Sequence, residues 1–272
     1  MNDLYAADVM QKIEELSPWF HNLHLKDGIQ TAPDHFLGDF PLFKWQEIAP
    51  YIPDDLTGCK ALDIGCNAGF YSFELALRGA EVTGIDIDPH YLQQAKWAAQ
   101  QYGLEKKVNF KQMQVYDLAR ESDSYDLVLF MGVFYHLRYP LLALDIVARK
   151  IRQMMIFQTM TIPGMDVFEQ LDSQINERDA LLEPGWPKMA FIEHRFAGDP
   201  TNWWIANHAG VEAMLRSAGM CITGYPGHEI FCCRPNPEAP SCVTTWNEAE
   251  YLSAIGEYTH LHAETRRTRS NK

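Results

Sequence analysis

The stretch that decides the fold is residues 61–69, Ala-Leu-Asp-Ile-Gly-Cys-Asn-Ala-Gly, where an apolar strand meets Asp63 and then turns through two glycines. An apolar run with helical character follows from Phe70 to Arg78. A second strand, Glu81–Asp86, again ends on an acid. A strand, a glycine-rich turn and a helix, followed by a strand that ends on an acid, are typical of the start of a nucleotide-binding α/β sheet.

The spacing within this turn indicates which ligand it binds. A dinucleotide-binding turn needs G-x-G-x-x-G, so that a helix N-terminus meets the pyrophosphate. Here the pattern is Asp63-x-Gly65-x-Asn67-x-Gly69, with Cys66 inside the turn. S-adenosylmethionine (SAM) has no phosphate but carries a cationic amino group, which suits an acid at a strand end. A glycine-lined turn lets the backbone approach its methionine part, and asparagine tolerates positive φ. The pattern therefore favours SAM over NAD, although a glycine-rich turn can also be no more than a tight turn.

Further cofactor contacts are expected after the second and third strands. Asp86 falls about twenty residues after the turn, where an acid can bind both ribose hydroxyls, and Ile87 follows it directly. A third strand is predicted at 107–110. It leads to Tyr116 and Asp117, a polar pair that can hold the adenine ring and its amino group.

A fourth strand, Tyr125–Phe130, runs into a loop that contains Met131, Tyr135 and His136. Ligands of open α/β sheets bind at the carboxyl ends of the strands, so this loop should border the site. Helices are predicted at Phe70–Arg78, Pro89–Tyr102 and Pro140–Lys150, a fifth strand up to about Gln158, and a closing strand pair at 221–223 and 229–233. This order predicts a Rossmann-like class I methyltransferase fold: α/β, with a mostly parallel seven-stranded sheet and helices on both faces.

Three segments are expected along the chain. Residues 1–57 form an N-terminal helical and loop extension over the cofactor site, with helices near 1–17 and 45–50. Residues 58–235 form the SAM-binding domain, which includes a helix at 207–218. It is interrupted at about 159–205 by an insertion rich in turn signals, which should cover the mouth of the site. Residues 236–272 form a C-terminal appendage, with one helix around 248–252 and a basic tail.

Composition narrows the possible partners. A formal net charge of −13 disfavours a grip on RNA backbone, although tRNA stays possible because a local basic patch needs only a few side chains. The chain has no apolar run near the ~20 residues of a membrane span and no leader pattern, so we expect a cytoplasmic protein without a membrane partner. Six cysteines do not make a disulfide framework here. Histidines 21, 24 and 35 lie close in sequence, but no ligand set is fixed and no metal is predicted.

Residues from about 19 to 160 resemble a group of bacterial methyltransferases, typified by the enzyme that completes 5-oxyacetyluridine at the tRNA wobble position. The resemblance lies in residues 21–23, 27–28, 43–45, 63–69 and 131–136. The stretch 198–204 with Asn207 looks more like an uncharacterised branch of that group. Carried over by position, the resemblance implies that Lys44, Met131 and Tyr135 line the cofactor pocket.

The tRNA enzyme of this group transfers a carboxymethyl group from carboxy-SAM. It holds the extra carboxylate with an upstream lysine and a C-terminal arginine, and neither has a clear counterpart in this sequence. Without those charges the extra carboxylate would lose its charge-assisted hydrogen bonds. Ordinary SAM is therefore the expected cofactor.

The expected reaction is in-line displacement of a methyl group onto a small-molecule or sugar acceptor, at a hydroxyl. His136 is the candidate general base, and Tyr135 the candidate hydrogen-bond partner of the acceptor. Each residue also has a structural interpretation: His136 as a helix cap and Tyr135 as a pocket wall. The alternative functions are a tRNA wobble-uridine (carboxy)methyltransferase and a SAM-binding protein without catalysis. The oligomeric state cannot be predicted from the sequence.

Overall fold

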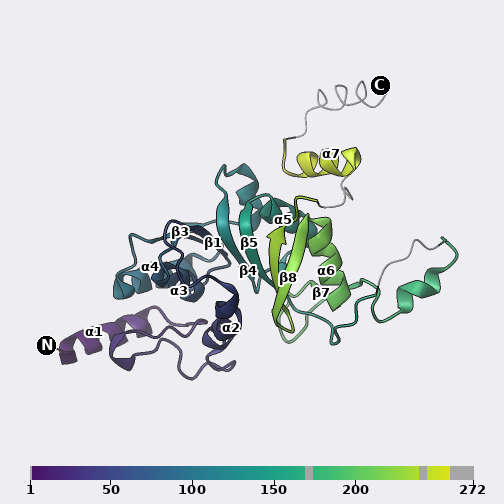
Figure 1. Cartoon of the computed structure of the whole chain (residues 1–272). Coiled ribbons are helices and arrows are strands. Elements are labelled where there is room, and N and C mark those ends of the chain that lie inside the picture. Colours follow the sequence, from purple (N-terminus) through teal and green to yellow (C-terminus); the bar gives the residue numbers. More distant parts are fainter. Residues whose placement is uncertain (1, 169–173, 239–243, 258–272) are drawn as a thin grey trace.

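A seven-stranded sheet forms the centre of the computed structural model, which describes residues 2–168, 174–238 and 244–257 (Figure 1). The strands follow the order β3-β2-β1-β4-β5-β9-β8, and β9 alone runs opposite to the other six. The predicted mostly parallel seven-stranded sheet is therefore confirmed. The strands are β1 (Lys60–Ile64), β2 (Glu81–Asp86), β3 (Val108–Gln112), β4 (Tyr125–Met131), β5 (Ile151–Gln158), β8 (Met220–Gly227) and β9 (Ile230–Pro235).

Both faces of the sheet are buried, because helices cover each of them. Successive side chains of a strand point to opposite faces. In β4, Leu127 and Leu129 accordingly join one hydrophobic cluster, while Val128 and Phe130 join the other. The predicted helices are confirmed, with α3 (Phe70–Leu77) and α4 (Pro89–Tyr102) over the first face and α5 (Pro140–Ala148) and α6 (His208–Ser217) over the second (Figure 1).

The N-terminal extension packs against α4. The Gln94 side chain donates hydrogen bonds to the carbonyls of Leu16 and Pro18, at 2.7 and 2.8 Å. The helix predicted at 45–50 begins five residues earlier than expected, because Pro41 lies in its first turn, where a missing N–H costs nothing. The extension contains α1 (Asn2–Glu15), α2 (Phe40–Ile48) and the 3₁₀ turns η1 (Lys26–Gly28) and η2 (Ala49–Tyr51).

The insertion after β5 holds more regular structure than its turn-rich sequence predicts. It contains a 3₁₀ turn, η5 (Arg178–Leu182), and two short strands, β6 (Met189–Phe191) and β7 (Trp204–Ala206), which pair antiparallel. The backbone N–H of Trp203 donates to the carbonyl of Tyr135 at 2.9 Å. The insertion is thereby tied to the loop after β4, which contains the 3₁₀ turn η4 (Phe134–His136).

The C-terminal segment adds α7 (Thr245–Ala254), which docks on the end of α5. There the Arg149 guanidinium pairs with Glu248 at 3.0 Å and lies over the Tyr251 ring. The predicted basic tail lies outside the described residues. No helix in the described part of the chain has the length and apolar character needed to cross a membrane.

Candidate active site

A cavity of about 890 Å³ opens at the carboxyl ends of the parallel strands. Its walls include the ends of β1, β2, β4 and β5, so it lies where the strand order reverses between β1 and β4. Open α/β sheets bind their ligands at this point. The N-terminal extension and the insertion supply further parts of the wall, so residues distant in sequence meet around one space.

The glycine turn brings bare backbone to the cavity. Gly65 has φ +72°, and a Cβ there would lie 2.3 Å from the Cγ2 atom of Val133. Its N–H donates to the carbonyl of Ile85 at 2.8 Å. Asn67 also adopts positive φ, +50°, as its side chain permits. Gly65 and Asn67 line the cavity, and no larger residue at Gly65 would fit without displacing Val133.

The other two residues predicted in this turn lie behind the cavity wall. Cys66 is fully buried in the core, and its N–H donates to the Ile85 carbonyl at 3.0 Å. Gly69 adopts φ +91° at the start of α3, where a Cβ would lie 2.9 Å from the Phe73 and Phe110 rings. Both residues pack against the core and support the conformation of the turn without lining the cavity.

The two acids of the motif occupy different environments. Asp86 lines the cavity, and its carboxylate accepts hydrogen bonds from the N–H groups of Asn67 at 2.8 Å and Asp88 at 2.9 Å. Ile87 lines the cavity beside it. Asp63 is only 2% exposed and accepts a 2.6 Å hydrogen bond from the Ser72 hydroxyl, and burial raises its pKa to about 7. It lies behind the turn rather than on the cavity wall.

The segment after β3 contributes to the cavity, but through other residues than those predicted. Tyr116 and Asp117 lie within the 3₁₀ turn η3 (Val115–Arg120), where the Asp117 carboxylate accepts from the N–H of Gln114 at 3.0 Å. The wall is formed instead by Met113, Gln114 and Val115. The chain leaves the sheet at Gln112, so the residues that follow at once are those at the sheet edge.

The loop after β4 places Met131, Tyr135 and His136 on the cavity wall. The His136 Nδ1 atom lies 2.9 Å from the Thr201 hydroxyl and 3.4 Å from the Thr201 carbonyl oxygen, which can only accept. The Thr201 hydroxyl in turn donates to Asp199 Oδ1 at 2.6 Å. This chain of bonds puts the imidazole proton on Nδ1 and leaves Nε2 as an acceptor.

The electrostatics favour a neutral imidazole. Burial lowers the pKa of His136, and the Asp199 carboxylate, 3.8 Å from Nδ1, opposes part of that effect. Burial and the charges of Glu229 and Asp199 raise the pKa of Tyr135 to about 12, so its hydroxyl keeps its proton at neutral pH. The site thus combines an acceptor nitrogen with a donor hydroxyl.

Sequence reasoning missed a polar group on the β5 side of the cavity. Gln158 and Glu229 both line it, and the Gln158 amide donates to Glu229 Oε2 at 3.2 Å. The other carboxylate oxygen accepts from the N–H of Thr161 at 3.1 Å. Gln158 ends β5 and Glu229 precedes β9, so only the sheet pairing brings them together and no local pattern signals it.

The extension supplies a third part of the wall. His21 and Lys44 line the cavity together with Tyr71 of α3. Two of these residues are nearly completely buried, His21 at 5% and Tyr71 at 7% exposed. Among the described residues, His21 Nδ1 and the Tyr71 hydroxyl have no hydrogen-bond partner. Lys44 is the one lysine or arginine on the wall formed by the described residues. The part of the chain that the structure describes contains no group of three or more His, Cys, Asp or Glu side chains arranged to bind a metal ion.

Comparison with known proteins identifies the family. Residues 55–208, more than half of the chain, match the family described as a methyltransferase domain. This chain belongs to the methyltransferase domain family. The predicted class, a SAM-dependent methyltransferase of class I fold, is confirmed by this match and by the sheet order.

Among curated relatives of this methyltransferase, the tRNA U34 carboxymethyltransferase of Azotobacter vinelandii (strain DJ) is 31% identical over 217 residues, which cover 78% of this chain and 59% of that protein. The enzyme of the same name from Pseudomonas aeruginosa (strain LESB58) is 27% identical with the same coverage. The chain therefore spans about three fifths of the length of these relatives. The predicted resemblance to this group is confirmed.

Solved structures share the fold at lower identity. The N-terminal domain of EvdMO1 with SAH bound has a TM-score of 0.56 and 20% identity, over 85% of this chain and 96% of that chain. A putative S-adenosylmethionine dependent methyltransferase from Listeria monocytogenes has a TM-score of 0.52 and 18% identity, over 71% and 98%. At such identities these structures show the fold alone.

Proposed function

We propose that this methyltransferase moves the methyl group of SAM to a hydroxyl of a small, polyhydroxylated acceptor such as a sugar. The observation that carries the proposal is the polar group on the β5 side of the cavity. Gln158, Glu229, Tyr135 and His136 face the same space as the glycine turn. A carboxylate, an amide and a neutral imidazole match hydroxyl groups better than phosphates. The cavity volume, about 890 Å³, is at the upper end of the range for small-molecule sites, about 300–1,000 Å³.

The residues on the other side of the cavity fit SAM. Gly65 offers backbone without a side chain, and its Cβ position is already occupied by Val133. Asp86 presents a carboxylate suited to ribose hydroxyls, and residues 113–115 line the cavity beside it, where the adenine would lie. SAM bound there supplies a methyl group activated by the positive sulfur. In this proposal β2 and β3, on one side of β1 in the sheet order, border the nucleoside, and β4 and β5, on its other side, border the acceptor.

The protein's own part in the reaction is to position the acceptor and remove its proton. His136 Nε2 accepts the hydroxyl proton, while Thr201 and Asp199 hold the ring by its Nδ1–H. The Tyr135 hydroxyl donates a hydrogen bond to the acceptor. The insertion, which carries Asp199 and Thr201, supplies part of the cavity wall on the acceptor side.

One experiment tests this function: transfer of labelled methyl from SAM, by the purified protein, into fractionated cell extract. We expect label in the small-molecule pool. His136→Gln should reduce the rate about 10²–10⁴-fold while SAH binding is retained. His194→Gln is the matched control, since that histidine is exposed in the same insertion. Label confined to RNA would overturn the proposed acceptor class.

The relatives named tRNA U34 carboxymethyltransferase support a second candidate, a tRNA nucleoside as acceptor with SAM or carboxy-SAM as donor. Among the described lining residues, Lys44 is the one lysine or arginine. Carboxy-SAM carries an additional carboxylate that would need further cations, so this lining favours ordinary SAM. A modified-nucleoside profile that changes in a deletion strain would favour the tRNA reaction. The remaining alternative, a SAM-binding protein without catalysis, would be removed by turnover with any acceptor.

A further inference from the structure

Two buried polar atoms on the cavity wall have no hydrogen-bond partner within residues 2–168, 174–238 and 244–257. They are His21 Nδ1, from the N-terminal extension, and the hydroxyl of Tyr71, from the first turn of α3. Buried polar groups are nearly always hydrogen-bonded, because leaving one unpaired forfeits its bonds to water. Since both residues face a cavity, a ligand group is the partner that would complete them.

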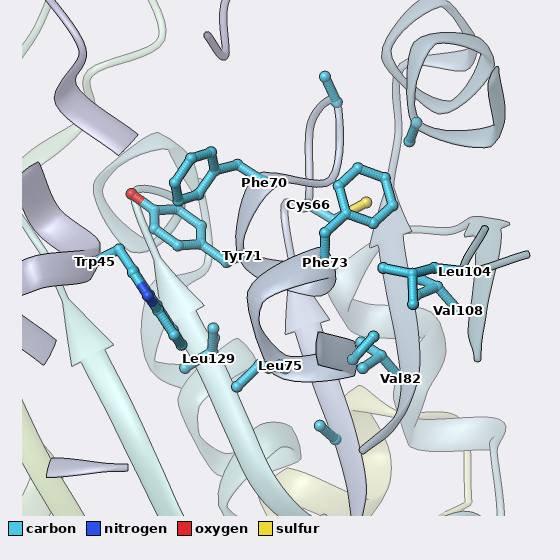
Figure 2. Close-up of a cluster of buried hydrophobic side chains, with 14 of the residues drawn as sticks. Trp45, Cys66, Phe70, Tyr71, Phe73, Leu75, Val82, Leu104, Val108 and Leu129 are labelled. Carbon is cyan, nitrogen blue, oxygen red and sulfur yellow. The ribbon is translucent and has the colours of Figure 1, made fainter. Parts of the chain in front are cut away.

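The surrounding packing fixes where the two atoms point. Figure 2 shows Tyr71 beside Phe70, with its hydroxyl oxygen on the side away from Leu75 in the core. The His21 and Tyr71 rings meet edge to face, with centroids 5.7 Å apart. This ring contact between the extension and α3 holds both groups together at the cavity wall.

Lys44 belongs to the same corner. The Phe40 ring packs on His21 with centroids 5.7 Å apart, and Lys44 follows Phe40 by four residues on α2. Residues four apart share one face of a helix. Lys44 lines the cavity, is half-buried, and forms no ion pair within the described part of the chain. The corner thus contains a positive charge that forms no ion pair with any residue the structure describes.

The chemistry of these three groups is that of donors. Burial, together with the charges of Asp63 and Glu47, raises the pKa of Tyr71, so its hydroxyl keeps its proton. Burial and His35 lower the pKa of His21 to about 3, so the ring is neutral and can donate from one nitrogen. A hydroxyl, an imidazole N–H and an ammonium together suit a carboxylate.

We propose that Lys44, His21 and Tyr71 form a carboxylate-binding corner for the amino-acid part of SAM. This inference rests on the proposed function, because it assumes SAM as the donor. The carboxylate is the only anionic group of that molecule. Tyr71 lies two residues after Gly69, so the corner adjoins the turn whose backbone can approach the methionine part. The extension is then an integral part of the cofactor site.

The test is calorimetric and needs no turnover. SAH is compared with 5′-methylthioadenosine, which keeps the adenosine and the thioether but lacks the amino-acid part. Tyr71→Phe should weaken SAH binding about tenfold or more and leave 5′-methylthioadenosine binding unchanged. Tyr102→Phe is the matched control: its hydroxyl donates to the His24 carbonyl at 2.8 Å and holds the extension without lining the cavity. That variant should keep the wild-type ratio of the two affinities.

The outcomes separate this inference from the function on which it rests. If the wild-type protein binds neither compound, the proposed cofactor itself is wrong. If it binds both and Tyr71→Phe keeps the wild-type ratio, the corner does not hold the carboxylate. Decarboxylated SAM distinguishes the two ends of the amino acid, because it keeps the amine: a loss of its affinity in Tyr71→Phe would also overturn the inference. Lys44→Met, at a half-buried helix position, gives the same readout if Tyr71→Phe fails to fold.

Discussion

The motif predicts that the Asp63 carboxylate faces the ligand, but in the fold this side chain is buried behind the glycine turn. In the fold its pKa lies near 7, against an ordinary value of 3.8, because burial disfavours the charged carboxylate. The folded state therefore binds this proton more tightly than the unfolded state does. It follows that stability is lost as pH rises from about 4 to about 7, and that the loss is complete above pH 7.

The change Asp63→Asn should remove this pH dependence. Asparagine can still accept the Ser72 hydroxyl, and it carries no charge to bury. Urea unfolding without ligand should show little difference from wild type at pH 4 and a more stable variant at pH 8, by up to about 4 kcal/mol. A stability difference that is equal at the two pH values would mean that the Asp63 carboxyl does not titrate between them.

For single residues, the sequence predicts which residues belong to the site motif better than it predicts whether their side chains face the cavity or the core. Gly65 and Asp86 could be placed on the cavity from the motif alone, since positive φ and an acid at a strand end are local properties. Asp63 faces the core instead, because side chains alternate along a strand and no motif states which face a residue takes. Glu229 could not be found at all, because its place depends on how β9 pairs with β5.

At the scale of elements, Asn207 joins α6 to the insertion. Its side-chain oxygen accepts from the N–H groups of Gly210 and Lys188, at 2.9 and 2.8 Å, which caps the helix and holds the residue that precedes β6. Its amide donates to the carbonyls of Pro184 and Trp186, at 3.0 and 2.7 Å. The side-chain amide of Asn207 thus makes four hydrogen bonds, which join α6 to the insertion.

The change Asn207→Ala should cost about 2–4 kcal/mol of unfolding free energy, since it removes a cap and also leaves two carbonyls unpaired. Thr244→Ala, at the exposed cap of α7, is the control and should cost about 1 kcal/mol. Asn207→Asp should fall between them, because it keeps the cap but cannot donate. Urea unfolding measures all three. A cost for Asn207→Ala no larger than that of the control would show that the anchorage of the insertion adds nothing.

The helices and strands of the sheet could be predicted because their apolar periodicity is long and their ends carry turn signals. Strands β6 and β7 could not, because three residues are too few to show alternation and their pairing spans the insertion. The early start of α2 was missed for a different reason: Pro41 resembles a helix breaker unless it is known to lie in the first turn.

At the scale of the whole molecule, three separate stretches of chain converge on one cavity. The sheet edge could be predicted from the order of strands and helices. The contributions of His21, Asp199 and Thr201 could not, because they depend on how the extension and the insertion fold back. Such contacts are tertiary, so no local sequence pattern indicates them.

Net charge provides the last test, because it distinguishes the two candidate acceptor classes. With a formal charge of −13, the chain has little electrostatic attraction for tRNA. Non-specific nucleic-acid binding usually has a Kd of about 10⁻⁴–10⁻⁶ M at physiological salt and rests on lysine and arginine contacts to phosphate. We expect filter binding of bulk tRNA to lie at or beyond the weak end of that range in 200 mM salt. Replacing Arg266, Arg267 and Arg269 by Glu should remove any residual affinity. Micromolar binding that falls steeply between 50 and 200 mM salt would mean that a basic surface forms despite the overall charge, and would favour the tRNA acceptor.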